Sequence, residues 1–240
     1  MYEKNMTTRR DDMSAEQQLT KFLDIYLYNK ISPEYKFVTR ITDKAQQLQG
    51  IDVMLGCNNG DSIYIDEKAQ LHYLDKCLDT FAFEISFVGV DETVRKGWLY
   101  NHDLKTDTYM LIWPIETIYH NKIISLDSSK RKDKVRELLK TIKYDDFEKL
   151  ECYFIKKDAI KKFLADNGWD EQKVLNKACD IREKKLLGKT SLTGIYSFYF
   201  YFTPVSNYSE APINIVIRKK FLYNLAYKRF LVTKDKLIKI

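Results

Sequence analysis

The stretch between Gly50 and Gln70, GIDVMLGCNNGDSIYIDEKAQ, constrains the fold of this 240-residue chain more than any other segment. Residues 58–60 read Asn-Asn-Gly, and these residue types tolerate the positive φ angles of a tight hairpin turn. Apolar side chains alternate through residues 62–65, as in a strand with one buried face. The stretch therefore predicts two antiparallel strands. Their ionisable groups are costly to bury unless they are paired or bind a metal.

The residues around this hairpin predict a helix followed by a mixed sheet. Ser14 is a suitable N-cap for a helix with apolar residues at three- and four-residue spacing, preceded by a charged leader at residues 1–12. The further elements expected in this half are strands at 35–41, 80–87 and 108–113, the last ended by Pro114, and a helical turn at 95–100. This order is typical of an α/β or α+β fold, a mixed β-sheet flanked by helices.

The second half of the chain predicts more helix. We expect helices at 128–142, 158–167, 170–187 and 219–227, and strands at 150–155, 195–202, 213–217 and 229–232. The loop at about 121–134 is the one candidate boundary. We therefore divide the chain into a core at 1–120 and a mixed helix and strand extension at 121–240, with a single domain as the alternative.

The charge is unevenly distributed along the sequence. Residues 212–240 hold eight Lys or Arg against one acid, a net +7, which leaves about −1 for the rest of a chain whose total is +6. A basic segment on a near-neutral body suits a polyanion such as nucleic acid. An ordinary solvated cationic face is the alternative.

Cysteine usage and hydropathy indicate a cytoplasmic location. The four cysteines have no CxxC spacing and no histidine at ligand spacing, which disfavours zinc and fits a reducing compartment. No secretory signal begins the sequence, and no apolar run approaches the roughly 18 residues of a membrane span. We therefore expect no membrane partner.

The acids and the lysine of the hairpin suit metal-dependent phosphodiester hydrolysis. Residues two apart on a strand share a face, so Asp66 and Lys68 are expected at one site and Glu67 on the other side. Together with Asp52 on the first strand, they offer carboxylates to a hard cation such as Mg²⁺, with Mn²⁺ as a possible substitute. A lysine beside the ion orients the attacking water and stabilises charge on the phosphate.

These residues resemble the motif of the PD-(D/E)xK superfamily, the restriction-endonuclease-like nucleases. The resemblance covers about residues 14–114. Asp52 matches the first acid, Asp66 the second and Lys68 the lysine, with 13 residues between the two acids. Glu16 stands where many members carry an acid on the preceding helix, and Gln70 where some carry an extra polar residue. Ile51 replaces the proline of the motif name.

The resemblance implies Mg²⁺-dependent cleavage of nucleic acid, which we expect to be DNA, on a restriction-endonuclease-like core. Asp52 and Asp66 would hold the metal, Lys68 would position the water, and Glu16 would assist. A bulge that turns Glu67 inward would make it a ligand in place of Asp66 or beside it. A homodimer would supply the two sites that double-strand cleavage needs. The alternative is a non-catalytic nucleic-acid-binding or assembly module on the same fold.

Three further residues are candidates for substrate contact or support, against ordinary surface polarity. Arg40 and Gln70 flank the motif, and Glu84 stands within a predicted strand. The aromatic run at 195–202, IYSFYFYF, predicts a packed sheet or a dimer surface, with stacking of bases as the less favoured alternative.

Overall fold

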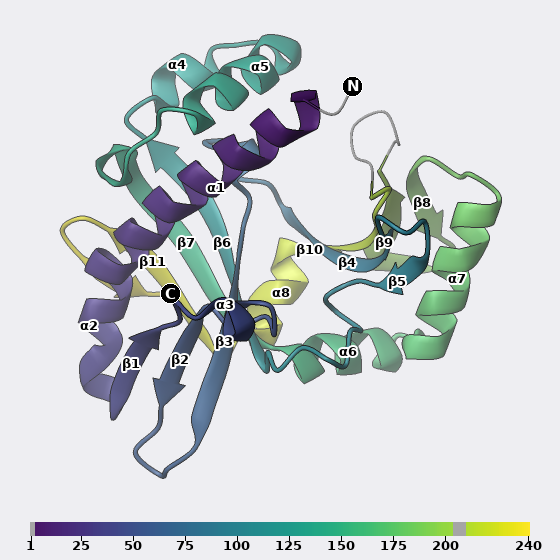
Figure 1. The fold of residues 1–240 in the computed structure, drawn as a ribbon, viewed down its shortest axis with the longest axis horizontal. Helices are drawn as coiled ribbons and strands as arrows, with labels where there is room; N and C mark the ends of the chain where they lie inside the picture. The colour runs from purple at the N-terminus through teal and green to yellow at the C-terminus, as the bar shows by residue number, and fades with distance from the viewer. Residues whose placement is uncertain (1–2, 204–209) are drawn as a thin grey trace.

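The computed structural model describes residues 3–203 and 210–240, so most of the loop expected between the strands at 195–202 and 213–217 lies outside the described residues. The chain forms a mixed α+β fold with two sheets and flanking helices, which confirms the predicted fold class (Figure 1). In spatial order the seven-stranded sheet contains β1 (Phe37–Arg40), β2 (Val53–Gly56), β3 (Ser62–Ala69), β6 (Thr108–Thr117), β7 (Phe147–Lys156), β11 (Lys228–Thr233) and β12 (Leu237–Lys239). The five-stranded sheet contains β5 (Val94–Lys96), β4 (Thr80–Val88), β10 (Ile213–Arg218), β9 (Ile195–Phe202) and β8 (Gly188–Leu192).

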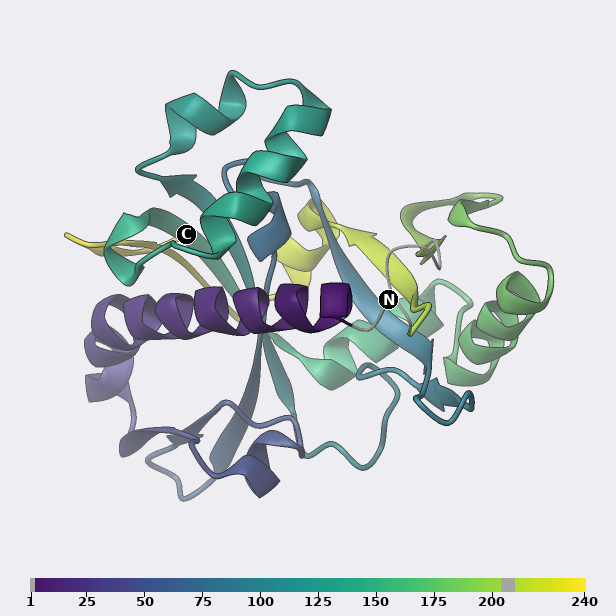
Figure 2. The same cartoon turned by 45° about the horizontal axis from the view of Figure 1, so that its top comes forward.

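The helices cover the sheets from several sides (Figures 1 and 2). They are α1 (Glu3–Leu23), α2 (Asn29–Ile31), α3 (Lys44–Gln47), α4 (His120–Ile124), α5 (Ser128–Leu139), α6 (Lys157–Asp166), α7 (Glu171–Glu183) and α8 (Lys219–Leu225). A π-helical turn at Asp24–Tyr28 joins α1 to α2, and 3-10 turns lie at Ser32–Glu34, Leu71–Tyr73 and Tyr144–Asp146. Within the described residues, no helix is both long enough and apolar enough to cross a membrane.

Strands β3 and β6 are the parallel pair of the seven-stranded sheet, whose other neighbours are antiparallel. A parallel connection requires a crossover, which is usually a helix. Here the crossover contains β4 and β5 instead, and these strands belong to the second sheet. After β3 the chain passes through the 3-10 turn at Leu71–Tyr73 into the second sheet, so the two sheets meet beside the acid-x-lysine motif, which is formed by Asp66, Glu67 and Lys68.

The two faces of the seven-stranded sheet pack into two different cores. On β6, Met110 and Ile112 join the core with α1 and α5, whereas Tyr109 and Leu111 join the core with α6, α7 and the second sheet. In the β3–β6 pair, Asp66 lies opposite Tyr109, Glu67 opposite Met110 and Lys68 opposite Leu111. Because side chains alternate between faces, Asp66 and Lys68 lie on the face of the second core and Glu67 on the face of the first.

Several local predictions are confirmed. The hairpin forms as expected, with β2 paired antiparallel to β3 across the turn at residues 58–60. The residues Ser32-Pro33 predict the end of the first helix, and the helix does end at Ile31, with a 3-10 turn that holds Pro33. The strands expected at 195–202 and 213–217 form as β9 and β10, and they pair with each other.

Other local predictions are wrong. The first helix begins at Glu3 and not at Ser14, so residues 3–12 belong to the helix. Residues 94–96 form strand β5, although a helical turn was predicted at 95–100. Pro114 does not end its strand: it lies opposite Leu150, and the register shifts directly after it. A bulge accommodates a residue that cannot donate a ladder hydrogen bond, which explains why β6 continues to Thr117.

Both halves of the chain contribute strands to both sheets. Strand β6 pairs with β7 in one sheet, and β4 pairs with β10 in the other. The division at residue 120 therefore does not separate one sheet from the other.

Candidate functional site

The acid-x-lysine motif lies near the end of β3, beside Asp52, which immediately precedes β2. Lys68 Nζ is 2.6 Å from Asp66 Oδ1, and the Asp66 side chain is also within hydrogen-bond contact of Asp52. Asp52 Oδ2 accepts a hydrogen bond of 2.8 Å from the backbone N–H of Glu67. The hairpin therefore brings the two predicted acids and the predicted lysine together.

Asp66 is buried, with 4% of its surface exposed. Burial raises the pKa of its carboxyl to about 6; the charge of Lys68 opposes this rise and the charge of Asp52 adds to it. Two touching carboxyl groups in a buried place carry more negative charge than one lysine balances. A bound cation would stabilise their ionised form.

Lys68 is held in its charged form by the acids around it. Burial alone would lower the pKa of its ammonium group, but Asp66, Asp52 and Glu16 together raise that pKa above its ordinary value. The Trp98 ring lies on another side, with its centroid 5.4 Å from Lys68 Nζ. Lys68 is therefore a hydrogen-bond donor at this site and not a proton acceptor.

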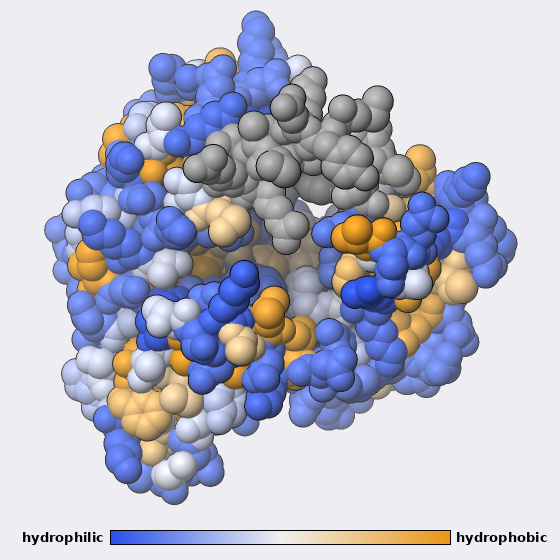
Figure 3. Space-filling model, in the orientation of Figure 1, coloured by the Kyte–Doolittle hydropathy of each residue, from blue (hydrophilic) through white to orange (hydrophobic). Residues whose placement is uncertain are grey.

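A cavity of about 640 Å³ joins the motif to α1. Among the residues that line it are Glu16, Asp52, Asp66, Lys68 and Trp98. Figure 3 shows the surface hollowed near its middle, between the part of the molecule with the seven-stranded sheet and the part with the five-stranded sheet. Glu16, the helix acid that the resemblance implied, thus lines the same cavity as the residues of the hairpin.

Glu67 belongs to a separate network on the other face of β3. Arg40 reaches its two carboxylate oxygens at 2.6 and 3.1 Å, and the Tyr28 hydroxyl donates to one of them at 2.7 Å. Arg40 also pairs with Asp24 at 2.6 Å. With both oxygens engaged, the Glu67 side chain is a poorer ligand candidate than Asp66. Arg40, a candidate for substrate contact, is likewise engaged by two acids, although it too lines the cavity.

Glu84 and Gln70 differ in their relation to the site. Burial and the charge of Glu210 raise the pKa of Glu84 to about 7, and the charge of Lys68 opposes this rise. Glu84 is thus close enough to Lys68 for their charges to interact. Gln70 donates from Nε2 to the Thr80 carbonyl at 2.8 Å, which ties the end of β3 to the start of β4. Gln70 therefore supports the backbone of the motif.

Two glycines permit the close approaches that place these groups. Gly50 has a φ of +76°, and a Cβ there would lie 2.5 Å from Thr106 Oγ1. A Cβ on Gly97 would lie 2.5 Å from the Glu84 carbonyl oxygen. Gly50 therefore allows the backbone just before Asp52 to turn close to Thr106. Gly97 allows the segment that carries Trp98 to pack against Glu84. Trp98 was not among the predicted site residues, because only the contact between β3 and the second sheet brings it there.

The raised pKa of Glu84 predicts a pH dependence of stability. Between its ordinary pKa of 4.5 and its folded pKa of about 7, the folded protein keeps a proton that the unfolded chain has released. Stability from this group is fully present below the lower value and is lost as the pH rises through the upper one. The free energy of unfolding should fall over this range by on the order of 3 kcal/mol at most.

Urea unfolding in EDTA at several pH values would measure this fall. We expect Glu84→Gln to flatten the fall, because the amide does not titrate. Glu137→Gln is the control, since Glu137 lies on the surface of α5 and 68% of its side chain is exposed. A pH profile of Glu84→Gln identical to that of the wild type would contradict the prediction.

The donor set fits a magnesium ion held with water and substrate. In the part of the chain that the structure describes, no group of three or more His, Cys, Asp or Glu side chains is arranged to hold a metal. Mg²⁺ is commonly bound through one or two carboxylates, with waters and substrate phosphates as its remaining ligands. The touching carboxyl groups of Asp52 and Asp66 meet that lower requirement.

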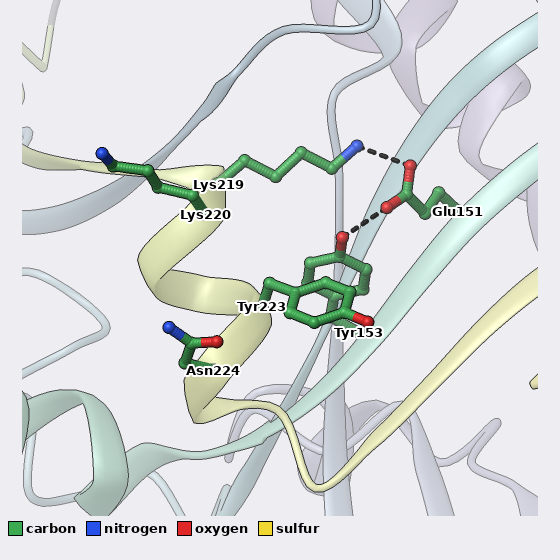
Figure 4. Close-up of a pocket in the computed structure, with 6 residues that line it drawn as sticks. All are labelled: Glu151, Tyr153, Lys219, Lys220, Tyr223 and Asn224. Atoms are coloured by element: carbon green, nitrogen blue, oxygen red, sulfur yellow. Dashed lines mark hydrogen bonds and ion pairs between the residues drawn. The ribbon is translucent and has the colours of Figure 1, made fainter. Parts of the chain in front are cut away.

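A second recess, of about 560 Å³, lies between α8 and β7 (Figure 4). Lys219 points towards Glu151 at 2.6 Å, and the Tyr153 hydroxyl donates to the other Glu151 oxygen. Lys220 extends in a different direction. Glu151 is thus already paired with Lys219, and the recess offers no second acid like the Asp52 and Asp66 pair.

The basic segment at 212–240 is partly neutralised in the fold. Ion pairs join Lys219 to Glu151, Lys228 to Glu34, Lys234 to Glu148 and Arg218 to Asp79, at 2.6, 2.5, 2.7 and 3.8 Å. The acids come from elements elsewhere in the chain. The segment is therefore less available to a polyanion than its sequence composition indicated.

Comparisons of this chain with models of protein families, with characterised proteins and with solved structures found no match.

Proposed function

We propose that the chain is a Mg²⁺-dependent nuclease that hydrolyses phosphodiester bonds at the site formed by Asp52, Asp66 and Lys68. The observation that carries this proposal is the buried Asp66 carboxyl, in contact with Asp52 on one side and 2.6 Å from Lys68 on the other. Two acids and a charged lysine at one end of a cavity provide the groups that phosphodiester hydrolysis requires.

Asp52 and Asp66 would hold the metal, with Mn²⁺ as a possible substitute. When bound, Mg²⁺ supplies positive charge that stabilises the transition state at the phosphate. The backbone N–H of Glu67 holds one Asp52 oxygen in place at 2.8 Å, while the Glu67 side chain is engaged elsewhere. Asp66 is therefore the preferred second ligand.

Lys68 and Glu84 would act on the attacking water and the phosphate. The raised pKa of Lys68 keeps its ammonium group charged, so it donates hydrogen bonds to the water or to the phosphate oxygens. The water oxygen bonds to phosphorus, the bond to the leaving oxygen breaks, and the water must lose a proton. Glu84, whose charge interacts with that of Lys68 and whose pKa is about 7, would accept it. Glu16, across the cavity, would support the charge of Lys68.

In this proposal the substrate is DNA, and the protein acts in the cytoplasm. The net charge of +6 supports a polyanionic substrate. A homodimer is required only if both strands of a duplex are cut in one event.

Cleavage of a substrate panel tests the proposal. Supercoiled, linear, branched and single-stranded DNA, together with single-stranded RNA, would be incubated with the protein in Mg²⁺, Mn²⁺ or EDTA. We expect cleavage of at least one substrate with either metal and none with EDTA. Asp52→Asn should be inactive in the same assay. Equal cleavage by Asp52→Asn, or cleavage in EDTA, would refute the proposed site.

The second candidate is a nucleic-acid-binding module that does no chemistry. It is favoured over a two-metal nuclease by one observation: among the described residues, no three His, Cys, Asp or Glu side chains are arranged to hold a metal. Binding of the panel by the wild-type protein with no cleavage in either metal would support this reading.

A further inference from the structure

The second sheet has an aromatic outer face next to the proposed site. Along β9, Phe198 and Phe200 point into the core, so the residues between them and beyond, Tyr199 and Tyr201, lie on the opposite face. On β10 the same alternation leaves Asn214 and Val216 on that opposite face. We call Tyr199, Tyr201 and Lys189 on this side of the sheet the tyrosine face.

The pairing register connects this face to the site. Glu84 on β4 lies opposite Asn214, Asn214 lies opposite Tyr201, and Tyr201 lies opposite Lys189 on β8. Neighbouring strands are about 4.8 Å apart, so Tyr201 lies about 10 Å and Lys189 about 14 Å from Glu84 across the sheet. The Leu99 N–H donates to the Glu84 carbonyl at 3.2 Å, and the ring of the preceding residue, Trp98, has its centroid 5.4 Å from Lys68 Nζ, so this row of residues begins beside the proposed site.

The tyrosine face combines exposed rings with positive charge. Tyr201 is 37% exposed, and Lys189 Nζ lies 4.5 Å from the centre of the Tyr199 ring. At the start of β9, outside the tyrosine face, Tyr196 is 61% exposed and has Arg218 4.0 Å and Lys220 4.7 Å from its ring centre. Aromatic rings interleaved with cations are the surface on which single strands of nucleic acid bind, with bases on the rings and phosphates at the cations.

We propose that the tyrosine face binds a single-stranded nucleic acid that leads into the site. One or two nucleotides beyond the scissile phosphate would stack on Tyr201 and Tyr199, and Lys189 would contact their phosphates. Bases in a duplex are stacked on each other, so their faces are not available to these rings. The inference names the substrate class of the proposed function and rests on that function for its scissile phosphate.

Binding in EDTA tests the inference without any cleavage. Fluorescence anisotropy would follow a labelled 12-nucleotide DNA strand, and the same strand annealed to its complement. We expect the wild-type protein to prefer the single strand. Tyr201→Ala should bind it about 5- to 100-fold more weakly, because a base stacked on an aromatic ring contributes an affinity of that order. Tyr201→Phe keeps the ring and should bind within about 2-fold of the wild type.

Two further variants sharpen the result. Tyr223→Ala removes a tyrosine of similar exposure, 39%, from α8 and should leave binding unchanged. Lys189→Ala should reduce the dependence of log affinity on log salt concentration by about 0.7, the contribution of one phosphate contact to a single strand. Circular dichroism melting would establish that each variant is folded.

Each outcome separates this inference from the proposed function. Weakened binding by Tyr201→Ala supports the tyrosine face even if the wild type cleaves nothing in Mg²⁺, which would refute the nuclease alone. Cleavage by the wild type with unaltered binding by Tyr201→Ala would refute the tyrosine face alone. A preference for the duplex would overturn the inference. So would a dimer that Tyr201→Ala dissociates without a change in binding, as detected by light scattering.

Discussion

Replacing Lys68 with alanine is expected to lower the rate of phosphodiester cleavage by about 100- to 1,000-fold. A positioned donor that stabilises developing charge in a site shielded from water has an effect of that size when it is removed. Lys68 is such a donor, since three nearby acids keep its ammonium group charged and the cavity wall partly shields it. Initial rates of cleavage of the best substrate of the panel, at saturating Mg²⁺, would measure the loss.

Lys149→Ala is the matched control for this variant. Lys149 also pairs with a carboxylate, Glu116, at 2.7 Å, but this pair lies on the surface. We expect Lys149→Ala to cleave at the wild-type rate. Urea unfolding of both variants would separate a catalytic effect from loss of fold. A folded Lys68→Ala protein that cleaves as fast as the wild type would show that the water is oriented by another group.

The hairpin could be predicted from the sequence because its determinants are local. The Asn-Asn-Gly turn sets the register, and the period of two then decides which side chains share a face. Asp66 and Lys68 therefore lie together in the structure, with Glu67 on the other face, as the alternation indicated. Placing Asp52 beside Asp66 followed from the same register.

The surroundings of the hairpin depend on contacts between distant segments. Glu84 was assigned to a strand correctly, but the sequence does not show that β4 leaves the first sheet to pair with β10, more than a hundred residues later. Trp98 reaches Lys68 only through this second sheet. Pairings of such sequence separation are not encoded in any local pattern.

The net charge of residues 212–240, counted along the sequence, did not predict how much of that charge is neutralised in the fold. Strand β11 of this segment pairs with β7 and thereby meets acids from other segments. Lys234 reaches Glu148, and Lys228 reaches Glu34, about two hundred residues away. The local field of a segment therefore depends on its strand partners as much as on its own composition.

Replacing Arg40 with methionine is expected to destabilise the fold by about 3–5 kcal/mol. The Glu67 side chain is only 10% exposed, and Arg40 donates hydrogen bonds to both of its carboxylate oxygens. Arg40 also forms an ion pair with Asp24. Removing the arginine leaves a buried carboxylate without its cation, and this situation has a cost of that order. Burial already raises the pKa of Glu67 above its ordinary value, so the carboxyl is expected to take up a proton in the variant. The free energy of unfolding in urea at neutral pH would measure the loss.

A comparison within the same chain isolates the effect of burial. Arg95 pairs with Asp91 at 2.8 Å, but about half of each side chain is exposed, so Arg95→Met should change stability by less than about 1 kcal/mol. Adding Glu67→Gln to Arg40→Met removes the unpaired charge and should recover part of the loss, which a double-mutant cycle would report as coupling. Equal losses for Arg40→Met and Arg95→Met would contradict the buried network. Because the Glu67 backbone N–H holds Asp52, loss of this network should also weaken cleavage, and this effect does not require Arg40 or the Glu67 side chain to contact the substrate.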